Sequence, residues 1–442
     1  MKLAKLSLVA ALAAGSFGVA NATSLEDAIK NVDLSGKVFY RYENGYQSTE
    51  TNATTKTNGS SNMLKGVLNF RTAIEDNFFG VMSLRYQIRA VSGNGDGGYS
   101  SQMGNTLAGR GLGNNNASWA NGGVGQNGVG GAVGNNGFTV SQMFIGYTAG
   151  NTTVQVGKQT LGAFWTDDLD GVGLKLINQD IIGLTLVGVA VDNLQDDDGD
   201  FAVRNNPSGT NNGAVASRIV DENLYGVAAL GSYDPVAFQL WFAALSNVAQ
   251  VWAAEVSVAP ADVVNITAQV AGSMLSDRLI AANAALTPPD NVDLDDALFV
   301  GADVGFNFGG LNLDVGAVMF NTDKAKTSLV SIEDQGKFIS PGETLLGYNV
   351  FNGENLYGFV TAMYNIGAFG VGADFIMGQN KVGAAGAETK TDGMEIVGRL
   401  KYDISKKLGA AAFYSHTQEK DDSTPEEKVT TNRFRLQAEY KF

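Results

Sequence analysis

The sequence predicts an all-β protein: a transmembrane antiparallel β-barrel of about eighteen strands, with short periplasmic turns and long extracellular loops. Three observations predict this class. The last eleven residues alternate without a break between apolar and polar side chains. Similar alternating segments recur along the chain, separated by connections that are by turns short and long. The composition, with 56 glycines, 23 phenylalanines, 14 tyrosines and only 7 prolines in 442 residues, is typical of sheets with tight turns and aromatic girdles.

The C-terminal segment, residues 432–442, shows the alternation most clearly. A period of two is that of an extended strand. One apolar face and one charged face suit a strand with lipid outside and water inside. The closing Phe442 resembles the signal by which bacterial outer-membrane barrels are recognised for insertion. The apolar face carries Phe434, Leu436, Ala438, Tyr440 and Phe442, and the polar face carries Arg433, Arg435, Gln437, Glu439 and Lys441.

The N-terminus has the features of a secretory signal peptide. Two lysines, a short apolar run and an Ala-x-Ala site predict that residues 1–22 are removed and that 23–442 form a single barrel domain. The alternative is an apolar helix kept in the mature protein. No later run of about twenty apolar residues exists that would span a membrane as a helix. Since the chain has no cysteine, disulfides and thiol chemistry are excluded.

The charge balance is strongly acidic. Without Lys2 and Lys5, 28 of the 30 basic side chains remain against 45 acidic ones, which gives a net charge near −17. Such a surface is unsuited to binding nucleic acid and attracts cations.

Eighteen strands follow one another along the chain, each about long enough to cross a bilayer at a tilt. In the first three, apolar side chains lie on one face and Arg41, Arg71, Arg85 and Arg89 on the opposite face, toward the lumen. An even number of strands is required if both termini lie in the periplasm. We expect strands at 34–42, 63–75, 79–91, 138–148, 152–160, 171–178, 184–192, 223–233, 237–245, 250–258, 264–275, 296–308, 311–320, 355–365, 369–378, 392–403, 408–417 and 429–442.

The connections alternate in length, as periplasmic turns and extracellular loops do. Short turns are expected at 75–77, 149–151, 234–235, 260–262, 309–310, 366–368 and 405–407. Long polar stretches lie at 43–62, 92–137, 193–222, 276–293, 321–354, 379–391 and 418–428. Among these, 92–137 is a low-complexity stretch of glycine and asparagine, which indicates a disordered and variable surface loop rather than a binding site.

One connection, residues 246–249, is too short for an extracellular loop. The surrounding segment 238–258 is apolar on both faces and includes Trp241 and Trp252. Two explanations are open at this point. Either the strands are miscounted here, or this part of the barrel wall is buried against a neighbouring subunit.

Enzymatic function finds little support. The single histidine, His416, falls on the lipid-facing side of the seventeenth predicted strand, where a structural position in the aromatic girdle is expected. Hydrolysis by a histidine would need serine or aspartate partners beside it. The sequence offers no such grouping.

Three acidic clusters fall in predicted extracellular loops. The first lies in the third loop, 161–170, which includes Asp167, Asp168 and Asp170; the others lie at 196–200 and 332–336. In trimeric porins the third loop folds inward and narrows the channel. Divalent cations such as calcium take carboxylate oxygens from several segments. Acids of three loops above one barrel mouth could therefore converge on one ion, although solvated loop acids explain each cluster equally well.

The lumen-facing arginines lie opposite these acids. An acidic loop, with Asp167 and Asp168, against a wall with Arg41, Arg71, Arg85 and Arg89 would give a transverse field at the narrowest point. The plainer explanation is water-facing charge that any lumen tolerates.

The chain resembles the major outer membrane porins of Campylobacter and Helicobacter relatives. The resemblance is carried in order by short motifs: residues 1–22, Leu25-Glu26-Asp27-Ala28-Ile29-Lys30, Gly157-Lys158-Gln159, Trp165-Thr166-Asp167, Asp170-Gly171, Ile182-Gly183-Leu184-Thr185-Leu186, Asn223-Leu224-Tyr225-Gly226, Gly231-Ser232-Tyr233-Asp234, Ile332-Glu333-Asp334-Gln335-Gly336 and Tyr440-Lys441-Phe442. It implies a homotrimeric, cation-preferring general diffusion porin of eighteen strands, with calcium held at the constriction. Carried over by motif, the calcium ligands are Asp170 and Glu333, with Asp200 from a loop that departs from the family pattern.

The function expected is therefore passive passage of ions and small hydrophilic solutes through the outer membrane. Two alternatives remain. One is a surface adhesin or structural barrel with a plugged lumen, which long loops would suit. The other is a substrate-specific channel, which would need a ladder of aromatic or basic residues along the lumen.

Overall fold

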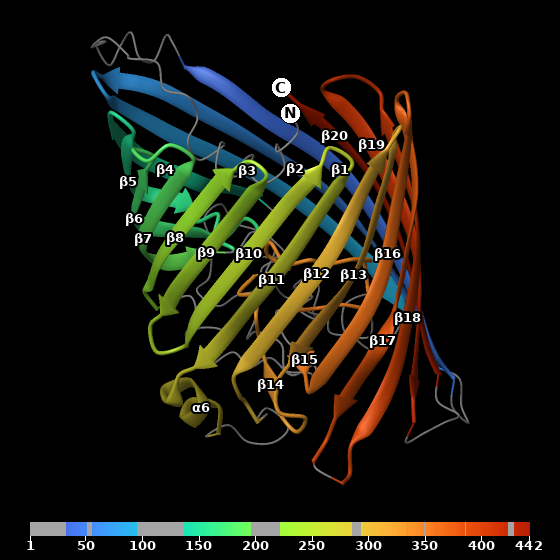
Figure 1. Cartoon of the computed structure of the whole chain (residues 1–442). Coiled ribbons are helices and arrows are strands. Elements are labelled where there is room, and N and C mark those ends of the chain that lie inside the picture. Colours follow the sequence, from blue (N-terminus) through green and yellow to red (C-terminus); the bar gives the residue numbers. More distant parts are fainter. Residues whose placement is uncertain are drawn as a thin grey trace.

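A computed structural model describes residues 32–50, 55–94, 137–195, 222–284, 293–333, 335–348, 351–384, 386–422 and 428–442. They form one 18-stranded antiparallel sheet closed into a barrel (Figure 1). Its strands are β1 Asp33–Glu50, β2 Thr55–Glu75, β3 Phe78–Asn94, β4 Gly137–Ala149, β5 Thr152–Thr160, β6 Asp170–Asn178, β7 Leu184–Gln195, β8 Leu224–Tyr233, β9 Val236–Leu245, β10 Ala249–Ala261, β11 Val264–Leu275, β12 Ala297–Phe308, β13 Leu311–Asn321, β16 Glu354–Ile366, β17 Phe369–Val382, β18 Thr389–Asp403, β19 Leu408–Asp421 and β20 Lys428–Lys441. The predicted fold class and strand number are confirmed.

The barrel closes between its first and last strands. β1 pairs antiparallel with β20 from Lys37 opposite Lys441 to Glu50 opposite Lys428. The N–H of Gly36 donates to the carbonyl of Phe442, and the N–H of Phe442 donates back, each at 3.0 Å. No sheet edge remains, so every strand has a hydrogen-bonded neighbour on both sides.

Several strands are longer than the alternation predicted. β1 runs to Glu50 and β2 begins at Thr55, where polar residues and glycines replace the apolar side chains. Strand pairing continues there, from Glu43 opposite Ser61 to Thr49 opposite Thr55. The alternation of apolar and polar side chains requires lipid on one face of the strand, whereas backbone hydrogen bonding between strands does not. The alternating sequence pattern therefore ends before the strand ends.

Large apolar side chains cover the outside of the barrel. Leu34, Val38 and Tyr40 of β1 are each at least 41 % exposed, while the intervening Phe39 is only 6 % exposed. Such an exposed apolar surface fits contact with lipid. Short turns join the strands at the end of the barrel that carries Phe442.

The short connection at 246–249 is a real hairpin. β9 and β10 pair directly, with Leu245 opposite Ala249. The strands are therefore not miscounted, and that explanation is wrong. Ala243, Leu245 and Val251 on the inward face are buried in a core with loop residues inside the barrel, which explains why this wall is apolar on both faces.

The long connections contain structure that the alternation did not predict. The stretch 276–293, expected as a loop, begins with helix α6, Asp277–Ala284, whose N-terminus is capped by Ser276 through a 3.1 Å bond from the N–H of Leu279. The stretch 321–354 contains β14, Thr327–Ser328, and β15, Phe351–Asn352, which pair with each other. Among the described residues, none of the helices has the length and apolar character needed to cross a bilayer. The predicted signal peptide 1–22 and residues 95–136 of the glycine-rich loop lie outside the described residues.

Candidate functional site: the lumen and its two inward loops

Two long connections fold against the inner wall. We call residues 161–169, between β5 and β6, loop 3, and residues 322–353, between β13 and β16, loop 7. Trp165 of loop 3 is 1 % exposed and its ring centroid lies 6.2 Å from that of Trp241 on the inward face of β9. Phe338 of loop 7 packs edge-on against Phe299 of β12, with centroids 4.7 Å apart. Both loops thus cover the apolar inner wall, whose buried side chains extend from Val191 of β7 to Ile376 of β17.

Loop 3 and loop 7 are joined by main-chain hydrogen bonds. The N–H groups of Ile332 and Glu333 donate to the carbonyl of Trp165 at 3.0 and 3.1 Å. The N–H of Lys337 donates to the carbonyl of Phe164 at 2.7 Å. The rings of Phe164 and Phe338 lie 4.9 Å apart in an edge-on contact. The two loops therefore form one packed unit inside the barrel.

Glu333 holds loop 3 from the side of loop 7. Its carboxylate oxygen Oε2 accepts bonds from the N–H groups of Asp167, Asp168 and Leu169 at 2.8, 3.2 and 3.2 Å. Glu333 is 1 % exposed. Three converging N–H groups stabilise a buried carboxylate as a cation would.

The other acids of loop 3 have separate surroundings. Asp167 is exposed, and Asp168 lies 3.6 Å from the ammonium of Lys65 on β2. Asp170, the first residue of β6, is 1 % exposed and accepts a 2.7 Å bond from the hydroxyl of Thr160 at Oδ1. Its other oxygen, Oδ2, is buried and accepts no hydrogen bond.

The predicted calcium ligands are thus partly placed. Asp170 and Glu333 lie at the base of loop 3 and at its contact with loop 7, whereas Asp200 lies outside the described residues. Within the described part of the chain, no three acidic or histidine side chains are grouped as metal ligands.

The predicted lumen arginines face inward where their side chains are described. The guanidinium of Arg41 donates to the side chain of Gln437 at 2.8 Å. Arg71 lies over the ring of Phe79, 4.0 Å from its centroid. Arg85 is buried. Arg89 lies in β3 opposite Met63 of β2, and its side chain is outside the described part.

A second basic group, which the sequence argument did not single out as a site, lines β18 to β20. Arg433, 2 % exposed, and Arg435 both pair with Glu43 of β1. Arg399 pairs with Asp374 of β17 and Glu343 of loop 7. All three guanidinium groups lie within 6 Å of the ring of Phe413.

Three inward carboxylates have no cation partner among the described residues. Glu255 of β10 accepts bonds from the side-chain amides of Gln239 and Gln269, at 2.8 and 2.5 Å. Asp303 of β12 and Asp314 of β13 lie on adjacent strands, and Asp314 accepts a 3.2 Å bond from the hydroxyl of Thr361. Their polar side chains at inward positions of apolar strands were the sequence signal that could have identified them.

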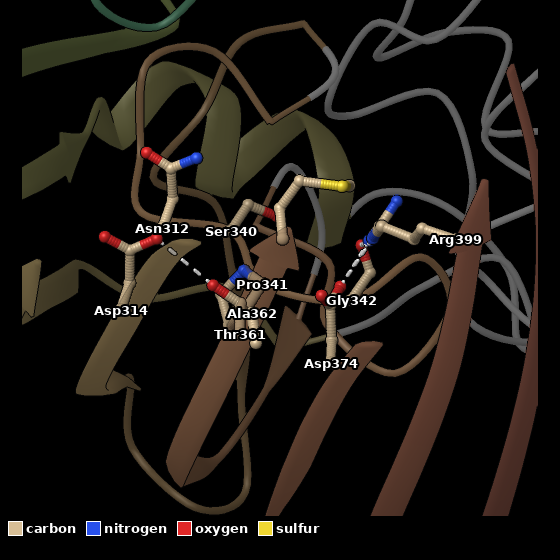
Figure 2. A pocket seen from close by; sticks show the side chains of 10 residues that line it. Asn312, Asp314, Ser340, Pro341, Gly342, Thr361, Ala362, Asp374 and Arg399 are labelled. Carbon is tan, nitrogen blue, oxygen red and sulfur yellow. Dashed lines mark hydrogen bonds and ion pairs between the residues drawn. The ribbon is translucent and has the colours of Figure 1, made fainter. Parts of the chain in front are cut away.

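Two cavities open in the lumen beside these groups. One of about 280 Å³ is lined by Asp314, Asp374 and Arg399 together with the 340–342 segment of loop 7. Figure 2 shows Arg399 directed at Asp374 and Thr361 directed at Asp314. The other, of about 520 Å³, is lined by Arg399, Arg435, Glu343 and the turn after β18. The open part of the lumen thus borders the charged wall formed by the arginines of β18 and β20 and, on the other side, Asp314 of β13. The two loops cover the apolar side chains of the inner wall.

Solved structures of similar fold are bacterial barrels with little sequence identity. The crystal structure of Pseudomonas aeruginosa OccK11 (OpdR) matches with a TM-score of 0.59 and 9% identity, covering 96% of this chain and 99% of that chain. Acinetobacter baumannii OccAB1 matches with a TM-score of 0.58 and 12% identity, covering 93% and 97%. P. aeruginosa OccK3 (OpdO) matches with a TM-score of 0.57 and 12% identity, covering 95% and 98%. These likenesses show the fold alone.

The curated proteins contain no match to this chain. A family model, by contrast, matches residues 1–442, the whole length. It describes the Campylobacter major outer membrane protein. The chain therefore belongs to the Campylobacter major outer membrane protein family and is a porin of the outer membrane.

Proposed function

We propose that this porin is a general diffusion channel for ions and small hydrophilic solutes, that it prefers cations, and that it works as a homotrimer. The observation that carries the cation preference is the set of three inward carboxylates without cation partners, Glu255, Asp303 and Asp314. The lumen arginines of β18 and β20 are neutralised by Glu43, Asp374 and Glu343. An uncompensated negative wall raises the local concentration of cations.

These acids differ from the loop acids that the sequence placed on the acidic side of the transverse field. Asp168 is paired with Lys65, and Glu333 is occupied by backbone N–H groups. The unpaired acids lie on β10, β12 and β13. In the closed 18-stranded sheet, β10 is nine strands from β1, and β12 is nine strands from β3. Nine strands is half the circumference, so the acidic wall faces the wall that carries Arg41 and Arg85. This arrangement supports the transverse field, with a strand wall rather than loop 3 as its acidic side.

Reversal potential in a planar bilayer under a KCl gradient tests the cation preference. The wild-type channel should prefer potassium, and the double variant Asp303→Asn/Asp314→Asn should shift the reversal potential toward zero. Asp303→Glu/Asp314→Glu is a matched control, because it replaces the same two side chains and keeps both negative charges. Anion preference of the wild type, or an equal shift in the control, would refute the assignment.

Calcium at the base of loop 3 is part of the proposal. The buried Oδ2 of Asp170, which accepts no hydrogen bond, fits a role as a calcium ligand. Glu333, whose Oε2 accepts the three N–H groups of loop 3, is the second proposed ligand. Asp200 is the third proposed ligand, as the family resemblance implies. Elemental analysis of the purified protein tests this: absence of calcium, or an unchanged content in Asp170→Asn, would contradict it.

A substrate-specific channel is the second candidate function. Arg399, Arg433 and Arg435 gather around Phe413 on neighbouring strands, which supplies a short basic row along the lumen. Their pairing with carboxylates favours general diffusion instead. Liposome swelling decides between the two: a specific channel admits one organic anion much faster than uncharged solutes of equal size. A plugged adhesin or structural barrel would pass almost no current in the bilayer.

The trimer is tested on the purified protein in detergent. Light scattering coupled to gel filtration should give three chains per particle once detergent is subtracted. A monomeric particle that still conducts would remove the trimer from the proposal and leave the channel function intact.

A further inference from the structure

The inner wall holds a buried carboxylate, that of Glu395 on β18, in contact with loop 7. Glu395 is 0 % exposed. It accepts bonds from the N–H groups of Glu343, Thr344 and Leu345 at 3.0, 3.3 and 3.0 Å, and from the hydroxyl of Ser415 at 2.5 Å. A carboxylate buried on the inner wall is thereby satisfied almost entirely by the backbone of loop 7.

The loop is shaped to receive this carboxylate. Gly342 has φ of +82°, a backbone conformation that other residues adopt only with strain. A Cβ at this position would lie 2.5 Å from Oε2 of Glu395 and 3.0 Å from Cδ1 of Ile376. Beside it, the hydroxyls of Thr344 and Ser415 are 3.2 Å apart. Only glycine lets the turn approach the wall this closely.

Two arginines of the wall hold the same segment. Arg399 pairs with the side chain of Glu343, and Arg433 donates to its main-chain carbonyl at 2.8 Å. The carbonyl of Gly342 accepts a further bond from Arg399 at 3.3 Å. The segment 340–345 is therefore held at its side chains and its backbone by β18 and β20.

Both lumen cavities border this segment. Residues 340–342 line the smaller cavity and Glu343 lines the larger one, while Arg399 and Met363 line both (Figure 2). The segment thus stands between the two open spaces, at the part of the lumen that loop 3 does not fill.

We propose that the 340–345 segment is a second constriction element of the channel and that Glu395 is the positioning residue that holds it across the lumen. Loop 7, together with loop 3, then sets the bore and places Glu343 at the narrow part. The inference rests on the proposed diffusion function for its conductance readout. Its structural part, the position of the segment against β18, can be tested without transport.

Two variants release the segment from opposite sides. Glu395→Gln weakens the acceptor on the wall, and Gly342→Ala pushes the turn away from it. Both should raise single-channel conductance by about twofold with added current noise, the change expected when one of two narrowing elements withdraws. The cut-off for neutral sugars in liposome swelling should rise in parallel.

Matched controls exist for each variant. Gly386→Ala introduces the same backbone strain, since Gly386 has φ of +83°, at a position where a Cβ meets no atom within 4 Å. Asp180→Asn makes the same carboxylate-to-amide change at an exposed position of the turn after β6, where Asp180 accepts a bond from Asn178. Both controls should leave conductance at the wild-type value.

A disulfide supplies the structural test and the rescue. In a chain without cysteine, Thr344→Cys/Ser415→Cys would join loop 7 to β19, because the two side-chain oxygens are already 3.2 Å apart. The bond should form spontaneously, appear as a shift on a non-reducing gel, and return Glu395→Gln and Gly342→Ala to wild-type conductance until reduced. Failure of the bond to form would overturn the position of the segment. If the bond forms but Glu395→Gln and Gly342→Ala already conduct like the wild type without the cysteine pair, only the role of the segment as a constriction is overturned.

Discussion

The contact of Glu333 with loop 3 gives a prediction whose size follows from the structure. Hydrogen bonds to a charged acceptor contribute about 1.5–3 kcal/mol each and neutral ones about 0.5–1.5 kcal/mol, so Glu333→Gln should weaken each of the three N–H bonds by about 1 kcal/mol. Because all three converge on one oxygen, their losses overlap, and we expect about 2 kcal/mol for the whole contact. That free energy corresponds to a ~30-fold larger population of loop 3 detached from loop 7.

Hydrogen exchange of the backbone amides measures this population directly. The amides of Asp167, Asp168 and Leu169 should exchange ~30-fold faster in Glu333→Gln, while those of the barrel strands remain unchanged. Wild-type protein treated with a calcium chelator is the necessary control, since loss of a bound ion could loosen the same loop. Unchanged exchange at these amides, or an equal acceleration throughout the barrel, would refute the role given to Glu333.

Three further predictions concern the wall and the loop bases. Glu43→Gln leaves Arg433 buried beside a neutral amide and should destabilise the folded barrel by about 3 kcal/mol, seen as a lower temperature for the heat-induced shift on a gel. Gly146→Ala places a Cβ within a phenylalanine ring of β3 and should lower the same temperature by a cost of about 1–3 kcal/mol. Partial burial acts to raise the pKa of Asp295, but the bond from Lys326 outweighs it and lowers that pKa below 3.8. The ion pair therefore stabilises the fold above the ordinary pKa of the carboxyl group, and this stabilisation is lost as pH falls through the lowered, folded-state pKa. Lys326→Ala should reduce heat stability slightly at about pH 7, and the difference from the wild type should shrink as the medium becomes strongly acidic.

The barrel itself was predictable because lipid and water impose opposite requirements on alternate side chains. β20 shows this from Phe434 to Tyr440, where apolar residues face out and charged ones face in. The same rule fails beyond the bilayer. In β1 from Glu43 onward and in β2 before Met63 no lipid is present to enforce the pattern, although backbone pairing continues.

The inward loop 7 was not predicted, because a long connection in a barrel is expected outside it. Two signals pointed inward in retrospect. Val330, Ile332 and Phe338 are apolar residues within a polar connection, and the inner faces of β9 and β10 are apolar where water was expected. Both apolar surfaces have to be buried away from water, and in the structure they belong to one packed core. Glu395, by contrast, has no distinguishing signal, since an inward acid on a strand is expected merely to face water; its partners lie about fifty residues away in loop 7.

The pairing of β1 with β20 also determines the order in which the molecule can assemble. Residues that meet across this pair, such as Arg41 and Gln437, are 396 positions apart, whereas other neighbouring strands are joined by hairpins or single loops. Contacts of such long sequence separation form late, because closing a very large loop lowers the conformational entropy of the chain. Until then both edge strands remain open to pairing with other chains, and the apolar surface that loops 3 and 7 share is exposed to water. The growing barrel is therefore most prone to aggregation just before its last strand pairs with its first.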